Sequence, residues 1–122
     1  MERKKLLIAD DSEMNRAILA NMLEQDFEIM EVSDGKEALA ALQIYRKDLS
    51  ALLLDIVMPG MDGLETARRL LEKWPAAKIL FVSSLAYDEM VAQSNALGAK
   101  GFLYKPFHRE EFLTKLADIV SV

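Results

Sequence analysis

Four short runs of hydrophobic residues without polar alternation occur at intervals along the chain. They cover residues 6–9, 51–54, 79–82 and 101–104. Runs of this kind are typical of strands that are covered on both faces, as in a parallel sheet. A fifth segment, residues 27–32, has acidic residues among its hydrophobic ones, which indicates a strand with one side nearer water. We therefore expect a parallel sheet with this segment at an edge.

Segments with helical spacing lie between the strands. Hydrophobic residues recur every three or four positions in the first three, and the positions that define them are Met14, Ile18, Leu19, Met22 and Leu23, then Ala38, Leu39, Ala41 and Leu42, then Leu64, Ala67, Leu70 and Leu71. Asp34 with Glu37 three residues later predicts the N-cap of the second helix. Pro75 ends the third helix.

Two further helices complete the pattern. Residues 88–97 have Met90, Val91 and Leu97 as their only large hydrophobic residues, so we expect this helix to be the least firmly held, and residues 109–120 form the last. Five strands, each followed by a helix, predict an α/β fold. We expect the doubly wound (βα)5, flavodoxin-like three-layer sandwich, with a five-stranded parallel sheet in the order 2-1-3-4-5.

The composition is that of one soluble domain. The chain has 122 residues, 52% of them hydrophobic, with no Cys and a formal net charge of −5. The absence of Cys excludes thiol catalysis and zinc–thiolate sites, and no hydrophobic stretch approaches the roughly 20 residues of a membrane span. Acidic charge argues against direct nucleic-acid binding. We expect one cytoplasmic domain, residues 1–122, that binds neither membrane nor nucleic acid directly.

Polar residues follow four of the five strands. Asp10 and Asp11 follow the first, Asp55 the third, Ser83 the fourth and Lys105 the fifth. The carboxyl ends of parallel strands lie on one rim, so these side chains should converge. Three close carboxylates repel one another, and a raised pKa or a bound cation relieves the repulsion. An oxygen-seeking ion such as Mg²⁺ fits best, with Mn²⁺ as an alternative.

These residues together closely resemble the receiver domain of two-component response regulators. The resemblance is carried by Asp10-Asp11, by residues 55–63, by Ser83, and by Gly98-Ala99 leading to Lys105-Pro106-Phe107, and it covers essentially the whole chain. It implies a signalling switch that accepts a phosphoryl group from a sensor histidine kinase, a phosphotransfer protein or a small phosphodonor. Such a module is not an enzyme for an external substrate, but it catalyses its own Mg²⁺-dependent phosphorylation and dephosphorylation.

The resemblance also assigns roles around the metal. Asp55 is implied to be the phosphoacceptor and a metal ligand. Asp11 is implied to bind Mg²⁺ directly and Asp10 mainly through water, while the backbone carbonyl of Val57 supplies a further oxygen. Val57 and Leu85 are hydrophobic at positions that line the approach of the attacking water, so we expect slow self-dephosphorylation.

The remaining roles concern the phosphoryl group and the switch. The resemblance implies that Ser83 and Lys105 contact the phosphoryl oxygens, and Pro106 can fix the backbone that aims Lys105. Phe102 stands at the aromatic switch position, where Tyr is frequent in the family, and Ser83 stands where Thr is usual. We expect activation to change the surface of the fourth helix, fifth strand and fifth helix. That surface would control an effector protein or a fused output domain, or form a homodimer.

Other functions fit the sequence less well. An interaction module that is never phosphorylated is expected to lack Asp55, Lys105 or the acidic pair, and all are present. A Mg²⁺-dependent phosphatase is expected to have a second Asp two residues after Asp55, where Val57 stands. A flavin-binding electron carrier needs a Ser/Thr/Gly-rich phosphate loop after the first strand. The length leaves room for the receiver switch alone, so a stand-alone regulator and a domain of a longer protein both remain open.

Overall fold

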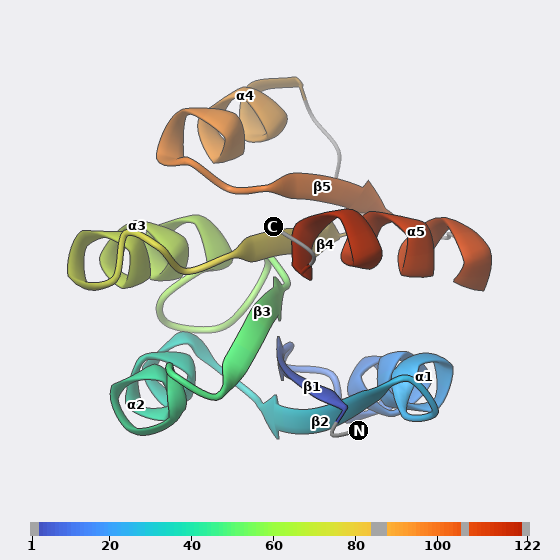
Figure 1. The fold of residues 1–122 in the computed structure, drawn as a ribbon. Coiled ribbons are helices and arrows are strands. Elements are labelled where there is room, and N and C mark those ends of the chain that lie inside the picture. Colours follow the sequence, from blue (N-terminus) through green and yellow to red (C-terminus); the bar gives the residue numbers. More distant parts are fainter. Residues whose placement is uncertain (1–2, 84–87, 106–107, 121–122) are drawn as a thin grey trace.

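The computed structural model describes residues 3–83, 88–105 and 108–120 (Figure 1). The strands are β1 (Lys4–Ala9), β2 (Phe27–Val32), β3 (Leu49–Leu54), β4 (Ile79–Ser83) and β5 (Gly101–Tyr104). The helices are α1 (Glu13–Leu23), α2 (Gly35–Tyr45), α3 (Gly63–Lys73), α4 (Asp88–Leu97) and α5 (Arg109–Val120). The predictions made for Leu85 and Pro106 lie outside the described residues.

The strands form one parallel sheet in the order β2-β1-β3-β4-β5, which confirms the predicted fold. Figure 1 shows α1 and α5 on one side of the sheet and α2 and α3 on the other. The segment 27–32 is an edge strand, as its pattern predicts. None of the described helices is long and hydrophobic enough to cross a membrane.

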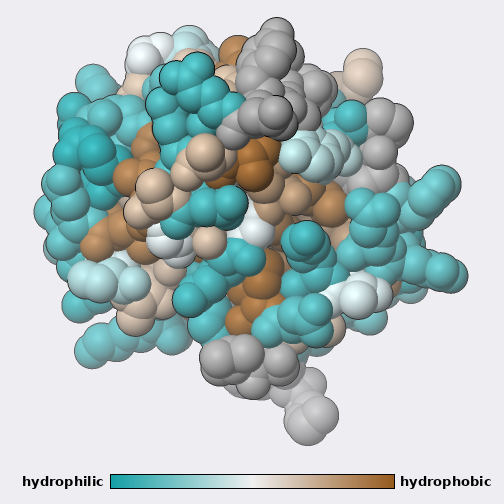
Figure 2. Space-filling view, turned by 90° about the horizontal axis from the view of Figure 1, so that it is seen from above, coloured by the Kyte–Doolittle hydropathy of each residue, from teal (hydrophilic) through white to brown (hydrophobic). Residues whose placement is uncertain are grey.

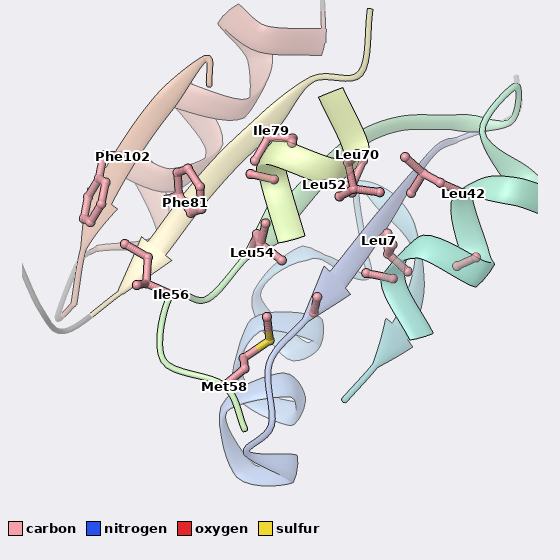
Figure 3. Packing of buried hydrophobic residues seen from close by; sticks show 14 residues of the cluster. Leu7, Leu42, Leu52, Leu54, Ile56, Met58, Leu70, Ile79, Phe81 and Phe102 are labelled. Atoms are coloured by element: carbon pink, nitrogen blue, oxygen red, sulfur yellow. The ribbon is translucent and has the colours of Figure 1, made fainter. Parts of the chain in front are cut away.

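A separate hydrophobic core lies on each face of the sheet. One joins strand residues such as Leu6 and Ile8 to Leu19 of α1 and Phe112 of α5. The other joins the opposite strand faces to α2, α3 and α4 (Figure 3), and its labelled residues are Leu7, Leu42, Leu52, Leu54, Ile56, Met58, Leu70, Ile79, Phe81 and Phe102. Burial on both faces explains why the inner strands lack polar alternation.

Side-chain caps begin the first three helices. The backbone N–H of Glu37 donates to Asp34 Oδ1 at 2.8 Å, so the predicted cap of α2 is confirmed. Ser12 and Asp62 accept equivalent bonds at the starts of α1 and α3. Helix α3 ends at Lys73, shortly before Pro75, as predicted. These caps set the points where the chain turns from the rim of the sheet into each helix.

Two hydrophobic residues of the predicted first helix are not in the core. Met14 is 73% exposed and Ile18 is 49% exposed, whereas Leu19 and Leu23 are buried. Helical spacing predicts which residues share a face, but the breadth of that face in contact with the sheet depends on tertiary packing. The exposed pair leaves a hydrophobic patch on α1, near the rim where this helix begins.

Helix α4 is shallowly packed, as its sequence predicts. Met90, Val91 and Leu97 are only partly buried against the core. Among the α4 side chains that the structure describes, only Ser94 is fully buried, and its Oγ donates to the backbone carbonyl of Val91 at 2.8 Å. A helix held by little buried hydrophobic area can shift at low cost in free energy.

Candidate functional site

The register of the sheet brings the predicted site residues to one rim. β1 and β3 end side by side with Ala9 opposite Leu54. The backbone N–H of Asp55 donates to the carbonyl of Ala9 at 3.0 Å. This hydrogen bond holds Asp55 immediately after the end of β3. The same extension occurs between β4 and β5, where the N–H of Lys105 donates to the carbonyl of Ser83 at 3.0 Å.

Three carboxylates meet at this rim. Asp10, Asp11 and Asp55 each offer an oxygen atom, and the three atoms lie within 4.8 Å of one another. Burial differs sharply among them, because Asp10 is 1% exposed, Asp55 is half-buried and Asp11 is exposed. The cluster is therefore open to solvent on the side of Asp11, where a cation or a phosphodonor can approach.

Asp10 is the anchored member of the cluster. Its Oδ1 accepts the backbone N–H of Ser12 at 2.9 Å, and its Oδ2 lies 3.3 Å from the Lys105 ammonium. Its backbone carbonyl accepts a bond from Arg16 Nη1 at 2.7 Å. A buried carboxylate is stable only when hydrogen-bonded or paired, and these contacts meet that requirement.

The electrostatic consequence appears at Asp55. Burial, followed by the negative charge of Asp10, raises the pKa of Asp55 to about 6 from an ordinary value of 3.8. The charge of Lys105 and the backbone N–H groups of Ile56 and Val57 act in the opposite direction, because they favour the ionised form. The Asp55 carboxylate is thus predominantly ionised at neutral pH, although at a cost that a cation would relieve.

The start of α3 presses against the Asp55 backbone. The N–H of Gly63 donates to the carbonyl of Ile56 at 2.7 Å. A Cβ at residue 63 would collide with the carbonyl oxygen of Asp55, so only glycine allows this approach. Val57, which follows in the same loop, is 53% exposed beside the rim. The backbone on the carboxyl side of Asp55 is therefore positioned by α3.

Ser83 and Phe102 lie on the two strands at the other end of the site. Ser83 is buried at the end of β4, opposite Tyr104 in the register. Figure 3 shows the Phe102 ring in the core near the Phe81 ring. Its centroid lies 6.0 Å from that of Phe81 and 5.2 Å from that of Tyr104. The predicted switch pair, Ser83 and Phe102, therefore occupies adjacent strands, and Pro106 lies outside the described residues.

Sequence reasoning missed three supporting residues: Ser12, Arg16 and Gly63. A Ser immediately before a helical pattern is an N-cap signal, so Ser12 could have been found. Gly63 stands where α3 begins, yet glycine at such a position does not reveal a close backbone approach. Arg16, which also pairs with Glu31 at 3.2 Å, has no sequence signal because its partners come from other elements.

Known proteins resemble this chain over almost its full length. A sequence model of the response regulator receiver domain matches residues 6–117. The chemotaxis protein CheY of Halobacterium salinarum is 34% identical over 119 residues, which are 97% of this chain and 98% of that protein. The chemotaxis protein CheY of Listeria monocytogenes is 37% identical over 114 residues, which are 92% of this chain and 94% of that protein.

Solved structures show the same similarity in three dimensions. The crystal structure of the CheX-CheY-BeF3-Mg+2 complex from Borrelia burgdorferi superimposes with a TM-score of 0.90 at 28% identity. The match covers 94% of this chain and 87% of that chain. A high-resolution structure of the Vibrio cholerae chemotaxis protein CheY4 gives a TM-score of 0.87 at 29% identity. The match covers 96% of this chain and 98% of that chain.

Proposed function

This chain belongs to the response regulator receiver-domain family of two-component signalling, and we propose that Asp55 is its phosphoacceptor. The donor is a sensor histidine kinase, a phosphotransfer protein or a small phosphodonor. The observation that carries the proposal is the position of Asp55 in a half-buried cluster with two other carboxylates and a lysine ammonium. Such a site brings together a nucleophile, carboxylates that can bind a metal ion, and a lysine that can bind phosphoryl oxygens.

Mg²⁺ is the proposed cofactor, and Mn²⁺ is an alternative. Asp10, Asp11 and Asp55 would hold it together with the backbone carbonyl of Val57. The donor set fits a hard cation, because all four groups offer oxygen and the three carboxylate oxygens lie within 4.8 Å. The effect of Asp10 on the pKa of Asp55 supports a need for positive charge there. When bound, the ion supplies charge neutralisation for the oxygens of the transferring phosphoryl group.

The protein's own residues carry the transfer. An ionised oxygen of Asp55 attacks phosphorus, so the O–P bond forms as the N–P bond of a donor phosphohistidine breaks, and the donor imidazole retains the electron pair and takes up a proton. The Lys105 ammonium, which pairs with Asp10 in this structure and whose charge lowers the pKa of Asp55, would turn toward a phosphoryl oxygen. The Ser83 hydroxyl donates a hydrogen bond to a second phosphoryl oxygen. Hydrolysis by water later releases inorganic phosphate and restores the carboxylate.

The proposed output is a change of surface around α4, β5 and α5. An aspartyl phosphate adds strong acceptors to the rim, and movement of Ser83 toward them leaves space next to Phe102. Helix α4 is shallowly packed and can follow such a movement.

The surface on this side of the molecule is partly hydrophobic. Figure 2, which shows the molecule of Figure 1 from above, has hydrophobic residues at the surface among hydrophilic ones. Tyr104 of β5 is 46% exposed. An effector, an output domain or a second copy would bind there.

The chemical step is tested by intact-mass measurement with Mg²⁺ and acetyl phosphate. We expect one added phosphoryl group, which is lost in Asp55→Asn and when EDTA removes the metal. Asp48→Asn, an exposed carboxylate in the turn before β3, is the matched control and should be phosphorylated normally. An adduct that persists in Asp55→Asn, or no adduct in the wild type with any phosphodonor, overturns the proposal.

The switch is tested separately by NMR. On activation we expect amide chemical shifts to change in α4, β5 and α5 as well as around Asp55. In Phe102→Leu the shifts around Asp55 should remain, while those in α4 become smaller. Shifts confined to the rim in the wild type would show that the phosphorylation state is not transmitted to this surface.

A further inference from the structure

A cavity of about 460 Å³ opens at the end of the sheet opposite to the acidic cluster. It lies where β3 begins and where Lys78 leads into β4, and its lining includes Trp74 and Pro75. Small-molecule sites in proteins typically measure about 300–1,000 Å³. The cavity has the size of such a site, and the residues that line it take no part in the proposed phosphoryl chemistry.

The lining of this cavity is largely hydrophobic. Leu42 of α2 and Leu52 of β3 are almost fully buried beneath it, and Ala77 and Val120 contribute further apolar surface. Trp74 is partly buried and packs against the core on the same side of the sheet. An apolar body of a ligand would exclude water from the partly exposed Leu49, Trp74 and Ala77 on binding.

Four cationic residues also line the cavity: Arg46, Lys47, Lys73 and Lys78. The Arg46 guanidinium lies 5.7 Å and the Lys73 ammonium 5.5 Å from the centroid of the Trp74 ring. Within the part of the chain that the structure describes, neither of these two cations forms an ion pair with a carboxylate. Positive charge thus accumulates at this cavity although the protein as a whole carries −5.

Most of the other described arginines pair with a carboxylate. Arg16, Arg68, Arg69 and Arg109 do so, whereas Arg3 donates to the backbone carbonyl of Glu24. Helices α2 and α3 end beside the cavity, and a helix C-terminus attracts a cation, which accounts for part of the charge. The helix ends do not account for a cavity of small-molecule size in which two cations lie near one aromatic ring.

We propose that this cavity binds a small organic anion, with its apolar body against Trp74 and the partly exposed Leu49 and Ala77, and its anionic group on Arg46 and Lys73. Charge complementarity selects an anion, and the cavity volume selects a small molecule over a folded partner. The site is independent of the Asp55 chemistry, because it occupies the amino-terminal end of the strands whose carboxyl ends carry the acidic cluster.

Trp74 is the only tryptophan of the chain, so its fluorescence reports on the cavity directly. The probe is 1-anilinonaphthalene-8-sulfonate, an aromatic anion that accepts energy from tryptophan. Its uncharged analogue, N-phenyl-1-naphthylamine, is the matched control. We expect saturable energy transfer from Trp74 to the anion and binding of the neutral analogue about tenfold weaker, because charge-assisted hydrogen bonds favour the anion.

Variants assign the binding to this cavity. Arg46→Glu and Lys73→Glu should each weaken binding of the anionic probe about tenfold and leave the neutral analogue unchanged. Lys36→Glu, an exposed cation at the start of α2, changes charge by the same amount and should have no effect. Asp55→Asn should also bind normally, so a failure of the proposed phosphorylation does not affect this result.

Three results would overturn the proposal. One is the absence of saturable energy transfer in the folded wild type, which would mean that the cations serve the helix ends alone. Another is equal affinity for the anionic and neutral probes. The third is unchanged anion binding in both glutamate variants. If these variants fail to fold by circular dichroism, Arg46→Gln and a salt titration replace them, and salt should weaken binding of the anion only.

Discussion

The ammonium of Lys105 lies 3.3 Å from Oδ2 of Asp10, across the sheet from the strand that carries it. Lys105 follows β5 at one edge, whereas Asp10 follows β1, and both β4 and β3 stand between them. The lysine therefore spans the rim and partly neutralises the acidic cluster. A cation already present in the cluster competes electrostatically with a metal ion.

Replacement of Lys105 should strengthen metal binding. We expect Lys105→Met to bind Mg²⁺ about three- to tenfold more tightly at low ionic strength, because a nearby positive charge is removed. Calorimetric titration measures the affinity. Lys100→Met, at the other end of β5, is the control and should leave the affinity unchanged. Equal or weaker binding in Lys105→Met would contradict the electrostatic interpretation.

Asp55 should make the metal-free protein less stable above pH 6. Its pKa is about 6 in the folded state and 3.8 as the ordinary value, so the folded state holds the extra proton between these values. The free energy of unfolding consequently falls as pH rises from about 4 to 6. Asp55→Asn removes this penalty and should raise stability at pH 8 by about 1–2 kcal/mol, after allowance for the partial exposure of the group.

Urea unfolding without Mg²⁺ at pH 4 and at pH 8 measures this effect. The stabilisation by Asp55→Asn should be present at pH 8 and nearly absent at pH 4. Asp48→Asn serves again as the exposed control and should show little change at either pH. A stabilisation that is independent of pH would mean that ionisation of Asp55 is not its cause.

Val57 should limit the loss of phosphate. Its side chain is hydrophobic and 53% exposed beside the rim, so it cannot hydrogen-bond the attacking water. Val57→Asn is expected to speed dephosphorylation several-fold, because an amide can position that water. Decay of the phosphorylated form, followed by intact mass, gives the rate. Ile44→Asn, which changes an exposed hydrophobic residue on α2, is the control. Slower decay in Val57→Asn would contradict a role for Val57 in limiting the loss of phosphate.

Gly63 should be essential for the position of Asp55. In Gly63→Ala the new methyl group meets the carbonyl of Asp55 and the Cα of Ile56, so we expect a loss of about 2 kcal/mol together with reduced phosphorylation. Gly98→Ala strains a backbone with φ of +96° but meets no neighbouring atom. It should lose stability and still be phosphorylated normally. Equal phosphorylation of both variants would exclude a positioning role for Gly63.

The exposed hydrophobic patch on α1, Met14 and Ile18, should bind protein phosphodonors. Met14 lies in the first turn of α1, immediately after the segment that carries Asp10 and Asp11, and it is 73% exposed. Met14→Glu is expected to slow phosphorylation by a histidine kinase about tenfold, because a charge is placed in a hydrophobic contact. Phosphorylation by acetyl phosphate should be unchanged. A parallel loss with both donors would show damage to the site itself.

Hydrophobic patterning predicted the strands, the helices and the parallel sheet. Runs buried on both faces, an edge strand with acidic residues and capped helices predict a parallel α/β sheet, because burial and backbone hydrogen bonding are local demands on each segment. The same reasoning predicted that Asp10, Asp11, Asp55, Ser83 and Lys105 converge, since strand ends share a rim. The shallow packing of α4 also follows from its few large hydrophobic residues.

The sequence by itself determined the elements, their order, the two-faced burial of the sheet and the chemical character of its carboxyl rim. Only the tertiary structure decided that Lys105 pairs with Asp10, that Gly63 presses on the Asp55 backbone and that Met14 stays outside the core. It alone also brought Arg46 and Lys73 to the Trp74 ring. These contacts depend on the distances between separate elements, whereas periodicity specifies only which residues share a face of one element.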